Sequence, residues 1–484
     1  MKHTALNPLN PLNPLNPLTA LTALAASLAL AGCMNLAPAY HTPAAPVPGA
    51  VGVDAAAEPA QASAPALEQA AALAWVQAPA LQQVLALALS HNRDLRIAWA
   101  NIEKARAQYG VQQADQLPTI AASGQASRSR SNSNSAANAA ITSNQFNAQI
   151  GFTSYELDLW GRVRNLSEAA LQQFLQTTLN QRSVEITLLA DVANAWLALA
   201  ADQARLQLAQ DTLAARRKGF ELTQRMHALG ATSGLVLAQN QTTVDSARAD
   251  VASYASQVAQ RRNALQLLVG GALPTELLPP PLDSAMAASA ALLALPTPLP
   301  SSLLLARPDI LAAEHNLRAS TANIGAARAA LFPSISLTAS AGSASRELSG
   351  LFDSGSGVWS FAPQIRLPIF DGGRNRANVR VAEADQQLAL AQYEKTVQIA
   401  FREAADALAE RSHWSERLDA QTSLVAATQQ ALTLSQARFK AGADDYLSVL
   451  DAQRSLYAAQ QTHITLRLAE QVNRITLYKV LGGG

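Results

Sequence analysis

The sequence predicts a mainly α-helical chain with two internal repeats, each of which contributes strands to a membrane β-barrel. Three observations support this fold class. Proline is absent from residues 119–273 and 369–484, where strong helix formers dominate. Landmark residues recur at a nearly constant spacing in the two halves of the chain. Each half also contains short segments in which apolar and polar residues alternate, which is the period of a strand.

The composition excludes several classes of protein. The chain has 484 residues and a formal net charge of +1, so it lacks the basic surface typical of nucleic-acid-binding proteins. One cysteine excludes an internal disulfide framework, and the seven histidines are not at metal-ligand spacing. No nucleotide-binding or hydrolase motif is present. We therefore expect neither an enzyme nor a cofactor or metal site.

The N-terminus has the pattern of a lipoprotein signal. The apolar run Leu18–Leu30 has 13 residues, too few for a membrane span of about 20. Leu30-Ala31-Gly32-Cys33 follows directly, so we expect a signal peptide at residues 1–32, with a chance cysteine after a leader as the alternative. Similarity to bacterial lipoproteins implies that Cys33 is lipidated and that Met34, in place of Asp, directs the protein to the outer membrane. The Ala- and Pro-rich residues 33–80 are expected to form a lipidated tether.

Two repeats organise the rest of the chain. Asp94–Ile120 matches Asp309–Ile335 at an offset of 215, and Gly230-Ala231 matches Gly442-Ala443 at an offset of 212. Repeat 1, residues 81–271, is expected to contain a helix, a strand hairpin at 118–160, a long helix at 167–229 and a helix at 233–269. Repeat 2, residues 309–484, is expected to contain a helix, a strand hairpin at 333–370, a long helix at 377–441 and a helix at 445–481.

The lengths of these helices indicate a helical barrel. At ~1.5 Å per residue each long helix would extend roughly 95 Å, which no ordinary globular domain can enclose. The helices at 94–116 and 233–269 together approach this length, so we expect short helices to stack end to end beside each long one.

The strand hairpins indicate how many copies assemble. The segments 146–153 and 334–341 alternate apolar with polar residues, as in an outer-membrane barrel with an apolar outer face and a polar inner face. Two ordinary hairpins on a soluble core are the alternative. Four strands cannot close a barrel, which needs about eight. A trimer supplies a 12-strand β-barrel and a 12-rod α-helical barrel, whereas a dimer supplies eight strands and little lumen.

From about Trp75 to Gly483 the sequence resembles the outer-membrane factor family, the TolC-type exit ducts, and within it the lipoprotein branch of the OprM and NodT type. The most specific segments are 307–310 (RPDI), 332–335 (FPSI), 368–374 (PIFDGGR) and 441–453 (AGADDYLSVLDAQ). The resemblance implies a homotrimer in the outer membrane, in contact with its lipid, a periplasmic tunnel and an equatorial linker at residues 272–308. It also implies two protein partners, a periplasmic adaptor and an inner-membrane transporter of the RND type.

The same resemblance implies site residues. Leu447 and Asp451 match the leucine and aspartate rings that narrow the periplasmic end in this family, and they lie one turn apart on one helix face. Gly230, Ala231, Gly442 and Ala443 match the turns that meet the adaptor, although each glycine is equally explained as a helix C-cap. Asp451 read alone is a solvated carboxylate, and the neighbouring Asp444 and Asp445 are expected to cap the following helix.

Two functions remain open at this point. The first is the outer-membrane exit duct of a tripartite efflux system, which conducts its cargo passively. The second is a helical periplasmic scaffold or binding lipoprotein that conducts nothing. The sequence does not identify the cargo, which could be drugs, metal ions, oligosaccharides or polypeptides.

Overall fold

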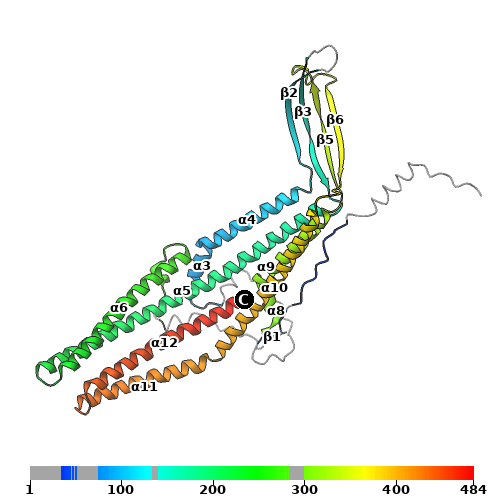
Figure 1. Ribbon diagram of the computed structural model, residues 1–484. Coiled ribbons are helices and arrows are strands. Elements are labelled where there is room, and N and C mark those ends of the chain that lie inside the picture. Colours follow the sequence, from blue (N-terminus) through cyan, green and yellow to red (C-terminus); the bar gives the residue numbers. More distant parts are fainter. Residues whose placement is uncertain are drawn as a thin grey trace, which may run out of the picture. The chain divides into compact units, whose positions relative to one another are not determined.

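The computed structural model describes residues 34–44, 46–47, 50–51, 75–132, 140–280, 282 and 299–483. The predicted signal peptide, Cys33, much of the predicted tether and the middle of the predicted linker lie outside this part. The described chain is mainly helical with a small antiparallel sheet (Figure 1). It forms two compact units. The described parts of Met1–His41, Arg106–Gln173 and Leu317–Ala389 form the first, and the described parts of Thr42–Ala105, Phe174–Asn316 and Leu390–Gly484 form the second.

The helices follow the two repeats. The first repeat contains α3 (Pro79–His91), α4 (Arg93–Ala114), α5 (Arg162–Ala228) and α6 (Gly234–Val269). The second contains α8 (Ser301–Leu305), α9 (Pro308–Ala329), α10 (Arg374–Ser412), α11 (Trp414–Lys440) and α12 (Tyr446–Val480). A 3-10 turn at Thr275–Leu277 and the short pair of strands β1 (Ala50–Val51) and β4 (Leu299–Pro300) lie among them.

The stretch 377–441, expected as one helix, is divided at His413. The hydroxyl of Ser412 donates to the Ala409 carbonyl, and the His413 amide donates to Glu410, three residues back. This tighter turn interrupts the α-helical hydrogen bonding. Trp414, directly after the break, is buried, with the Arg417 guanidinium 4.4 Å from its ring centroid.

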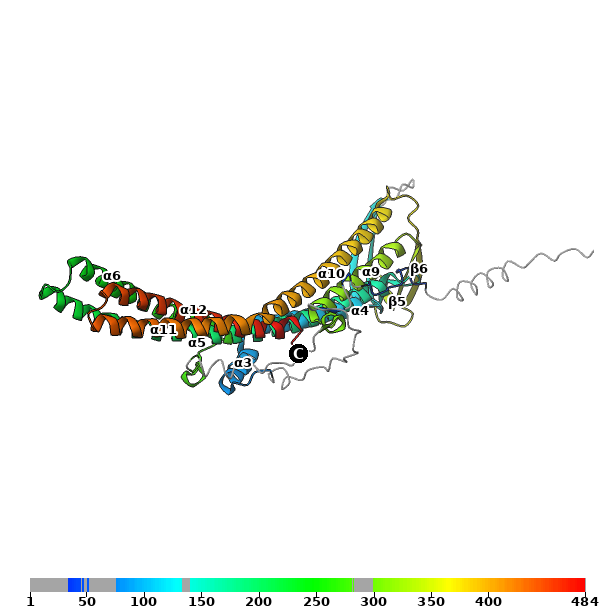
Figure 2. The ribbon, with the colours of Figure 1, turned by 90° about the horizontal axis from the view of Figure 1, so that it is seen from below.

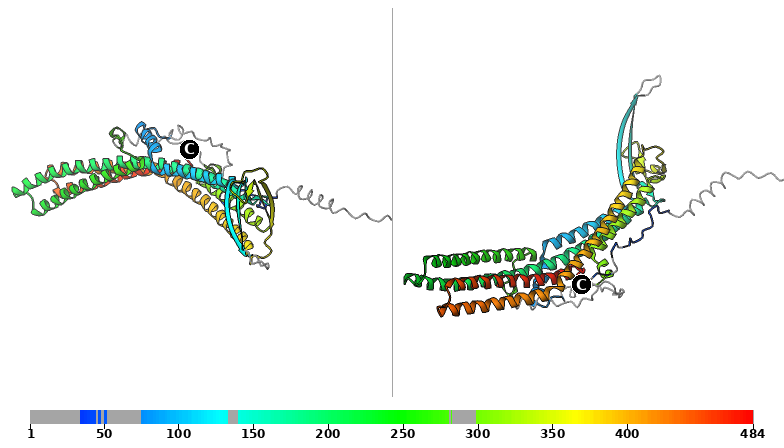
Figure 3. Two further views of the ribbon diagram at one scale, coloured as in Figure 1. Left: turned by 90° about the horizontal axis from the view of Figure 1, so that it is seen from above. Right: turned by 60° about the horizontal axis from the view of Figure 1, so that its bottom comes forward.

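The first unit contains a four-stranded antiparallel sheet, drawn curved in Figures 1 and 3. Its strands are β2 (Ile120–Asn132), β3 (Ala140–Leu157), β5 (Ser334–Ser345) and β6 (Gly357–Arg366), in the order β2-β3-β5-β6. Within the described residues β2 and β6 each pair on one side only. The sheet therefore has two open edges.

The strand register gives the sheet one apolar and one polar face. One cross-strand row contains Ile120, Phe152, Ala339 and Phe361, and the rows on the same face add Ile150, Ala341, Trp359, Leu157, Ile335 and Ile365. Many of these side chains are exposed, with Trp359 at 80%. The opposite face carries Ser123, Gln149, Ser340, Ser360 and Gln364. The period of two in the sequence thus separates two environments across one sheet.

A β-bulge keeps the apolar face continuous near the end of β3. Unbroken alternation after Phe152 would place Ser154 and Glu156 on that face. The register instead shifts between Phe152 and Tyr155, which returns Tyr155 and Leu157 to it. Ser154 adopts a φ of 56°, and its amide donates to the Thr338 hydroxyl.

The main core of the second unit consists mostly of aliphatic side chains and includes three aromatic ones, Trp75, Trp196 and Tyr478. Trp75 stacks on Tyr478 with ring centroids 4.2 Å apart, and the Trp196 indole donates to the Leu277 carbonyl at 3.0 Å. Both tryptophans are buried. Among the described helices α5 alone is long and apolar enough to cross a membrane, but 67% of its most apolar window is buried, as expected of a core helix.

Within this unit the long and returning helices run side by side: Figure 2 shows α6 along α5 and α12 along α11. Each returning helix ends against the start of a short one. The Asn92 side chain, before α4, donates to the Leu268 carbonyl at 2.8 Å, and Arg307, before α9, donates to the Val480 carbonyl at 3.1 Å. The two donors, Asn92 and Arg307, are 215 residues apart, and the two acceptors, Leu268 and Val480, are 212 residues apart. These are the offsets between the repeats. Both repeats therefore join their helices end to end at equivalent positions.

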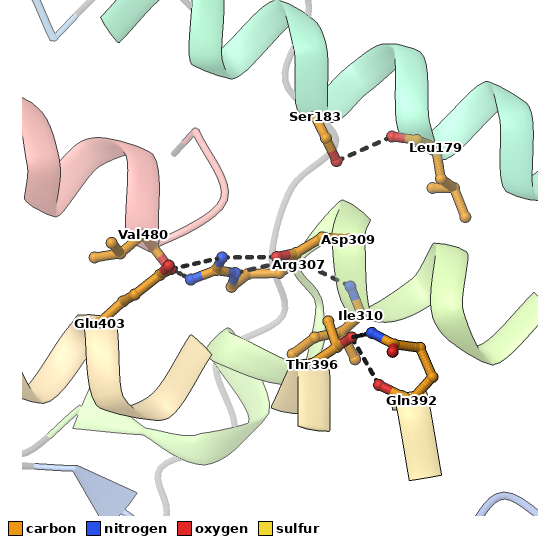
Figure 4. Close-up of polar contacts among 9 residues, drawn as sticks. All are labelled: Leu179, Ser183, Arg307, Asp309, Ile310, Gln392, Thr396, Glu403 and Val480. Carbon is orange, nitrogen blue, oxygen red and sulfur yellow. Dashed lines mark hydrogen bonds and ion pairs between the residues drawn. The ribbon is translucent and has the colours of Figure 1, made fainter. Parts of the chain in front are cut away.

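Of the two junctions, the one at Arg307 involves more side chains (Figure 4). Its buried guanidinium forms two hydrogen bonds with Asp309, at 3.0 and 2.7 Å, and one with Glu403 of α10 at 3.1 Å. Asp309 also accepts from the Ile310 amide in the first turn of α9. One side chain therefore links α9, α10 and the end of α12.

We expect Arg307→Met to lower the thermal midpoint of the helical circular dichroism signal. Removing one partner of a buried ion pair costs about 3–5 kcal/mol, but Asp309 and Glu403 are 38% and 37% exposed, so we expect about 2 kcal/mol. Arg328→Met is the matched control, because its pair with Glu383 is exposed on both sides and exposed pairs contribute less than about 1 kcal/mol. Equal midpoints for the two variants would contradict the central role of Arg307.

Candidate functional site

The two hairpin tips of the second unit have the same backbone geometry. Gly230 and Gly442 have φ values of 74° and 71°, which a residue with a side chain rarely adopts. The amides of Ala231 and Ala443 donate to the carbonyls of Met226 and Arg438, at 2.8 and 2.9 Å. Each tip is therefore a Schellman C-cap. This geometry explains why glycine occupies both positions. The contact of these turns with an adaptor stays a prediction.

The helices that follow the tips begin at equivalent N-caps. The Ser233 side chain accepts from the Val236 amide, and the Asp445 carboxylate accepts from the Ser448 amide. Asp445 thus caps α12, as the sequence predicts. Asp444 is used differently: it forms a bidentate pair with Arg438 at 2.6 and 2.8 Å, and this hydrogen bonding lowers the pKa of the Asp444 carboxyl.

Leu447 and Asp451 lie in the first turns of α12, beside a cavity of about 890 Å³. Side chains of α5 and α6 form the other wall, namely Arg216, Gln239, Thr242, Thr243 and Ser246. Leu447 is 47% exposed and the Asp451 side chain 63%. Both are thus available to line a pore. Asp451 also pairs with Arg454 at 2.5 Å, which moderates its negative charge.

A ladder of two tyrosine hydrogen bonds joins α6 to α12 near this cavity. Tyr457 donates to Asp250, and Tyr254 donates to Gln461, both at 3.1 Å. The partners on each helix are four residues apart, so the two bonds lie one turn from each other. Burial, followed by the charge of Asp250, raises the pKa of Tyr457 to about 12. The phenol is therefore held in its neutral, donating form.

Two further contacts join the hairpins. The buried Arg216 of α5 donates to the Thr243 carbonyl at 2.9 Å, and its guanidinium lies 5.4 Å from the Tyr457 ring centroid. Tyr446 lies against Gly219 of α5, where a β-carbon would overlap its hydroxyl. Gly219 is the one glycine in the long helix, and its absence of a side chain makes room for the neighbouring hairpin.

Sequence reasoning did not identify Arg454, Arg438 or Arg216 as parts of this region. Arg454 could have been found, because it lies three residues after Asp451 on the same helix. Arg216 could not, since its partners come from other helices. The described residues hold no group of three or more His, Cys, Asp or Glu side chains that could bind a metal ion.

The described residues that follow Cys33 are attached to the first unit. The Met34 amide donates to the Leu159 carbonyl at 3.2 Å, just after β3. The Asn35 side chain accepts from the Asn165 amide group at 2.8 Å. The Arg318 guanidinium lies over the Tyr40 ring, 4.9 Å from the ring centroid. Residue 34 is thus fixed close to the end of the sheet.

Comparison with known proteins gives consistent results. Residues 84–271 and 299–483 match the family described as outer membrane efflux protein. The chain is 42% identical over 458 residues to the toluene efflux pump outer membrane protein TtgC of Pseudomonas putida, covering 94% of this chain and 93% of that protein. It is 40% identical over 460 residues to the cation efflux system protein CusC of Escherichia coli, covering 95% and 97%.

A solved structure shares the fold. The outer membrane channel MtrE of Neisseria gonorrhoeae, crystallised in its open state, superimposes with a TM-score of 0.81 at 37% identity, covering 93% of this chain and 98% of that one. The likeness therefore extends over both repeats.

We expect Tyr457→Phe to destabilise the contact between α6 and α12 by about 1 kcal/mol at neutral pH, because Asp250 loses its donor. The folded-state pKa is raised, so this contribution is present below about pH 10 and is lost as the pH rises through about 12. The thermal midpoint of the variant should therefore fall less steeply over that range than that of the unmodified protein.

The matched control is Tyr254→Phe. It removes the adjacent rung, whose acceptor is an uncharged amide, and should cost less at neutral pH. If Tyr457→Phe left both the midpoint and its alkaline decline unchanged, the role assigned to the Tyr457–Asp250 bond would be wrong.

Proposed function

Because the chain belongs to the outer membrane efflux protein family and is an exit channel of the outer membrane for a tripartite efflux system, we propose that it acts as a homotrimer enclosing one continuous duct. Each copy contributes four strands to a twelve-stranded β-barrel and four helical rods to a twelve-rod α-helical barrel. The observation that carries this proposal is the open four-stranded sheet with one apolar and one polar face.

The open edges support an assembly of copies. In hydrocarbon every backbone donor and acceptor needs a partner within the protein, so a spanning sheet must close. Strands β2 and β6 each lack a neighbour on one side among the described residues. Four strands are too few to close, and eight leave little lumen. Twelve strands from three copies satisfy both edges and leave an open bore.

The height of the apolar face agrees with the height of the apolar band of an outer-membrane barrel. On β3 this face extends from Phe146, paired with Ser345, to Leu157, paired with Ile335, which is ten ladder steps. At ~3.3 Å per step and a tilt of about 40° this gives roughly 25 Å, the height of the apolar band of outer-membrane barrels. Trp160 stacks on Phe332 beyond its lower end, 4.8 Å between centroids, as aromatic residues do at membrane interfaces.

The remaining segments receive roles within this duct. Repeat 1 (81–271) and repeat 2 (309–484) form equivalent parts of the wall, and residues 272–308 form the equatorial linker. The turns at Gly230-Ala231 and Gly442-Ala443 contact a periplasmic adaptor. An inner-membrane transporter of the RND type supplies the energy, and the channel itself carries out no catalysis.

Leu447 and Asp451 form the periplasmic constriction. Threefold symmetry would place three leucines beside three carboxylates, and a leucine ring can close a pore by dewetting. Asp451 forms the exposed ion pair with Arg454 described above. The guanidinium groups would therefore offset part of the negative charge of the carboxylate ring. The ladder between α6 and α12 would hold the two hairpins together beside the constriction.

Lipidation of Cys33, after removal of residues 1–32, would anchor each copy beside the barrel. The attachment of Met34 to Leu159, next to Trp160, supports this role because Trp160 marks the proposed membrane boundary. The acyl chains would enter the bilayer there, and the rest of the stretch 33–80 would act as a tether.

We infer that the inner-membrane pump, and not the channel, selects the class of cargo. The relatives named above carry the words toluene and cation in their names, although both are about equally similar to this chain. We therefore propose a duct with broad passage for small solutes. The alternative of a non-conducting scaffold leaves the two-faced sheet without a purpose.

The proposal predicts that the purified protein forms pores in planar lipid bilayers, and that Leu447→Ala with Asp451→Ala raises the single-channel conductance. Both substitutions remove side chains from the constriction, so the narrowest cross-section should widen. The matched control is Leu235→Ala with Gln239→Ala, at the equivalent positions of α6. We expect the control to have a smaller effect.

Two outcomes would count against these assignments. Unchanged conductance in normally assembled Leu447→Ala/Asp451→Ala protein would reject the constriction. Absence of any pore from the unmodified protein would favour the scaffold.

We expect Cys33→Ser to prevent acylation, because Cys33 is the single cysteine of the chain and so the single thiol available. Mass spectrometry of the N-terminus should find diacylglycerol on the unmodified protein, and an unlipidated or uncleaved form of the variant. Normal acylation of the variant would refute the assignment.

A further inference from the structure

The apolar face of the sheet ends abruptly at its loop end. On β2 the residues of this face are Ile120, Ala122, Gly124 and Ala126, followed by Arg128 and Arg130. Ala126 pairs with Phe146, the last aromatic residue of the face, whereas Arg128 pairs with Asn144 and Arg130 with Thr142. The face therefore changes from apolar to basic and polar within one step.

The two arginines are the only charged residues that the strand register places on this face, over residues 120–130, 142–157, 334–345 and 357–366. Both side chains are exposed. Neither has an ion-pair partner among the described residues. Two adjacent guanidinium groups without a carboxylate are therefore directed to the same side as Ile150 and Trp359.

Their height is fixed by the same register. Successive residues on one face are ~6.6 Å apart along a strand. Arg128 thus lies ~6.6 Å and Arg130 ~13 Å beyond the level of Phe146, which ends the apolar band. In the proposed barrel the helices extend into the periplasm, so this end of the strands faces the cell exterior. The arginines would lie at the head-group level of the outer leaflet.

We propose that Arg128 and Arg130 form a binding site for the phosphate groups of an outer-leaflet glycolipid of the lipid A type. Guanidinium groups bind phosphate through paired, charge-assisted hydrogen bonds. Asn144 and Thr142, beside them on β3, supply further donors to the sugar and phosphate oxygens. The acyl chains of such a lipid would lie along the apolar rows that begin at Ala126 and Phe146.

The site belongs to the first hairpin alone. At the offset of 215 the positions equivalent to Arg128 and Arg130 are Ser343 and Ser345 on β5. Each copy would therefore hold one such site, next to its open edge at β2. In the trimer the bound lipid would lie close to the contact between neighbouring copies. This inference rests on the proposed barrel and its orientation.

The test uses the full-length protein in nanodiscs of phosphatidylcholine containing bisphosphorylated lipid A, with the retained lipid counted by native mass spectrometry. We expect Arg128→Gln with Arg130→Gln to reduce lipid A retention about tenfold or more, because two charge-assisted contacts are lost. Arg346→Gln is the control: it removes an exposed arginine just after β5, outside the proposed site, and should retain lipid A normally.

A second arm needs no substitution. The unmodified protein should retain lipid A much better than its dephosphorylated form, and excess inorganic phosphate should not displace it. Equal retention by the double variant, or of the dephosphorylated lipid, would overturn the proposal. Displacement by phosphate alone would indicate an anion site instead of a lipid site and would also overturn it.

Channel recordings of the same preparations separate this inference from the proposed function. Pores without selective lipid A retention would reject the lipid site and leave the duct intact. Failure of the unmodified protein to form pores or trimers would reject the duct, and with it the orientation on which the site depends.

Discussion

The open edges of the four-stranded sheet are the constraint on which the proposed assembly depends. Strands β2 and β6 each present a row of backbone donors and acceptors with no neighbour in the described chain. Water could satisfy such groups, but a lipid bilayer cannot. The apolar face of the same sheet favours lipid, and in the proposed assembly other copies pair these edges. Two copies would leave little bore, so the proposed ring has three.

The helical part of the chain is also built from two repeats with equivalent contacts. Asn92 and Arg307 occupy equivalent positions and hold the ends of α6 and α12 against the short helices that follow them. Gly230 and Gly442 turn the chain through the same C-cap. The repeats differ where the hairpins meet, because Asp451 and Arg454 have Gln239 and Thr242 as their counterparts. The proposed constriction would therefore carry charged side chains from one repeat only.

Much of this was accessible from the sequence. The absence of proline, the glycine tips and the change to a period of two predicted the helical hairpins and the strands. The resemblance of segments such as 368–374 and 441–453 to the outer-membrane factor family predicted the family, the outer-membrane location and the exit-channel function, which are confirmed. The break at His413 and the bulge at Ser154 were not predicted, because both arise from local competition between hydrogen bonds. The partners of Asp444 and Arg216 depend on how turns and helices meet. Cys33, Leu447 and Asp451 keep the roles predicted for them as proposals.

The roles proposed for the two-faced sheet and for the lipid site both require neighbouring copies that complete the wall. Native mass spectrometry of the protein extracted in mild detergent, combined with circular dichroism during heating, tests this most directly. The account predicts a particle of three chains whose β-sheet signal disappears as the trimer dissociates. A stable single chain that keeps its full β-sheet signal would contradict it.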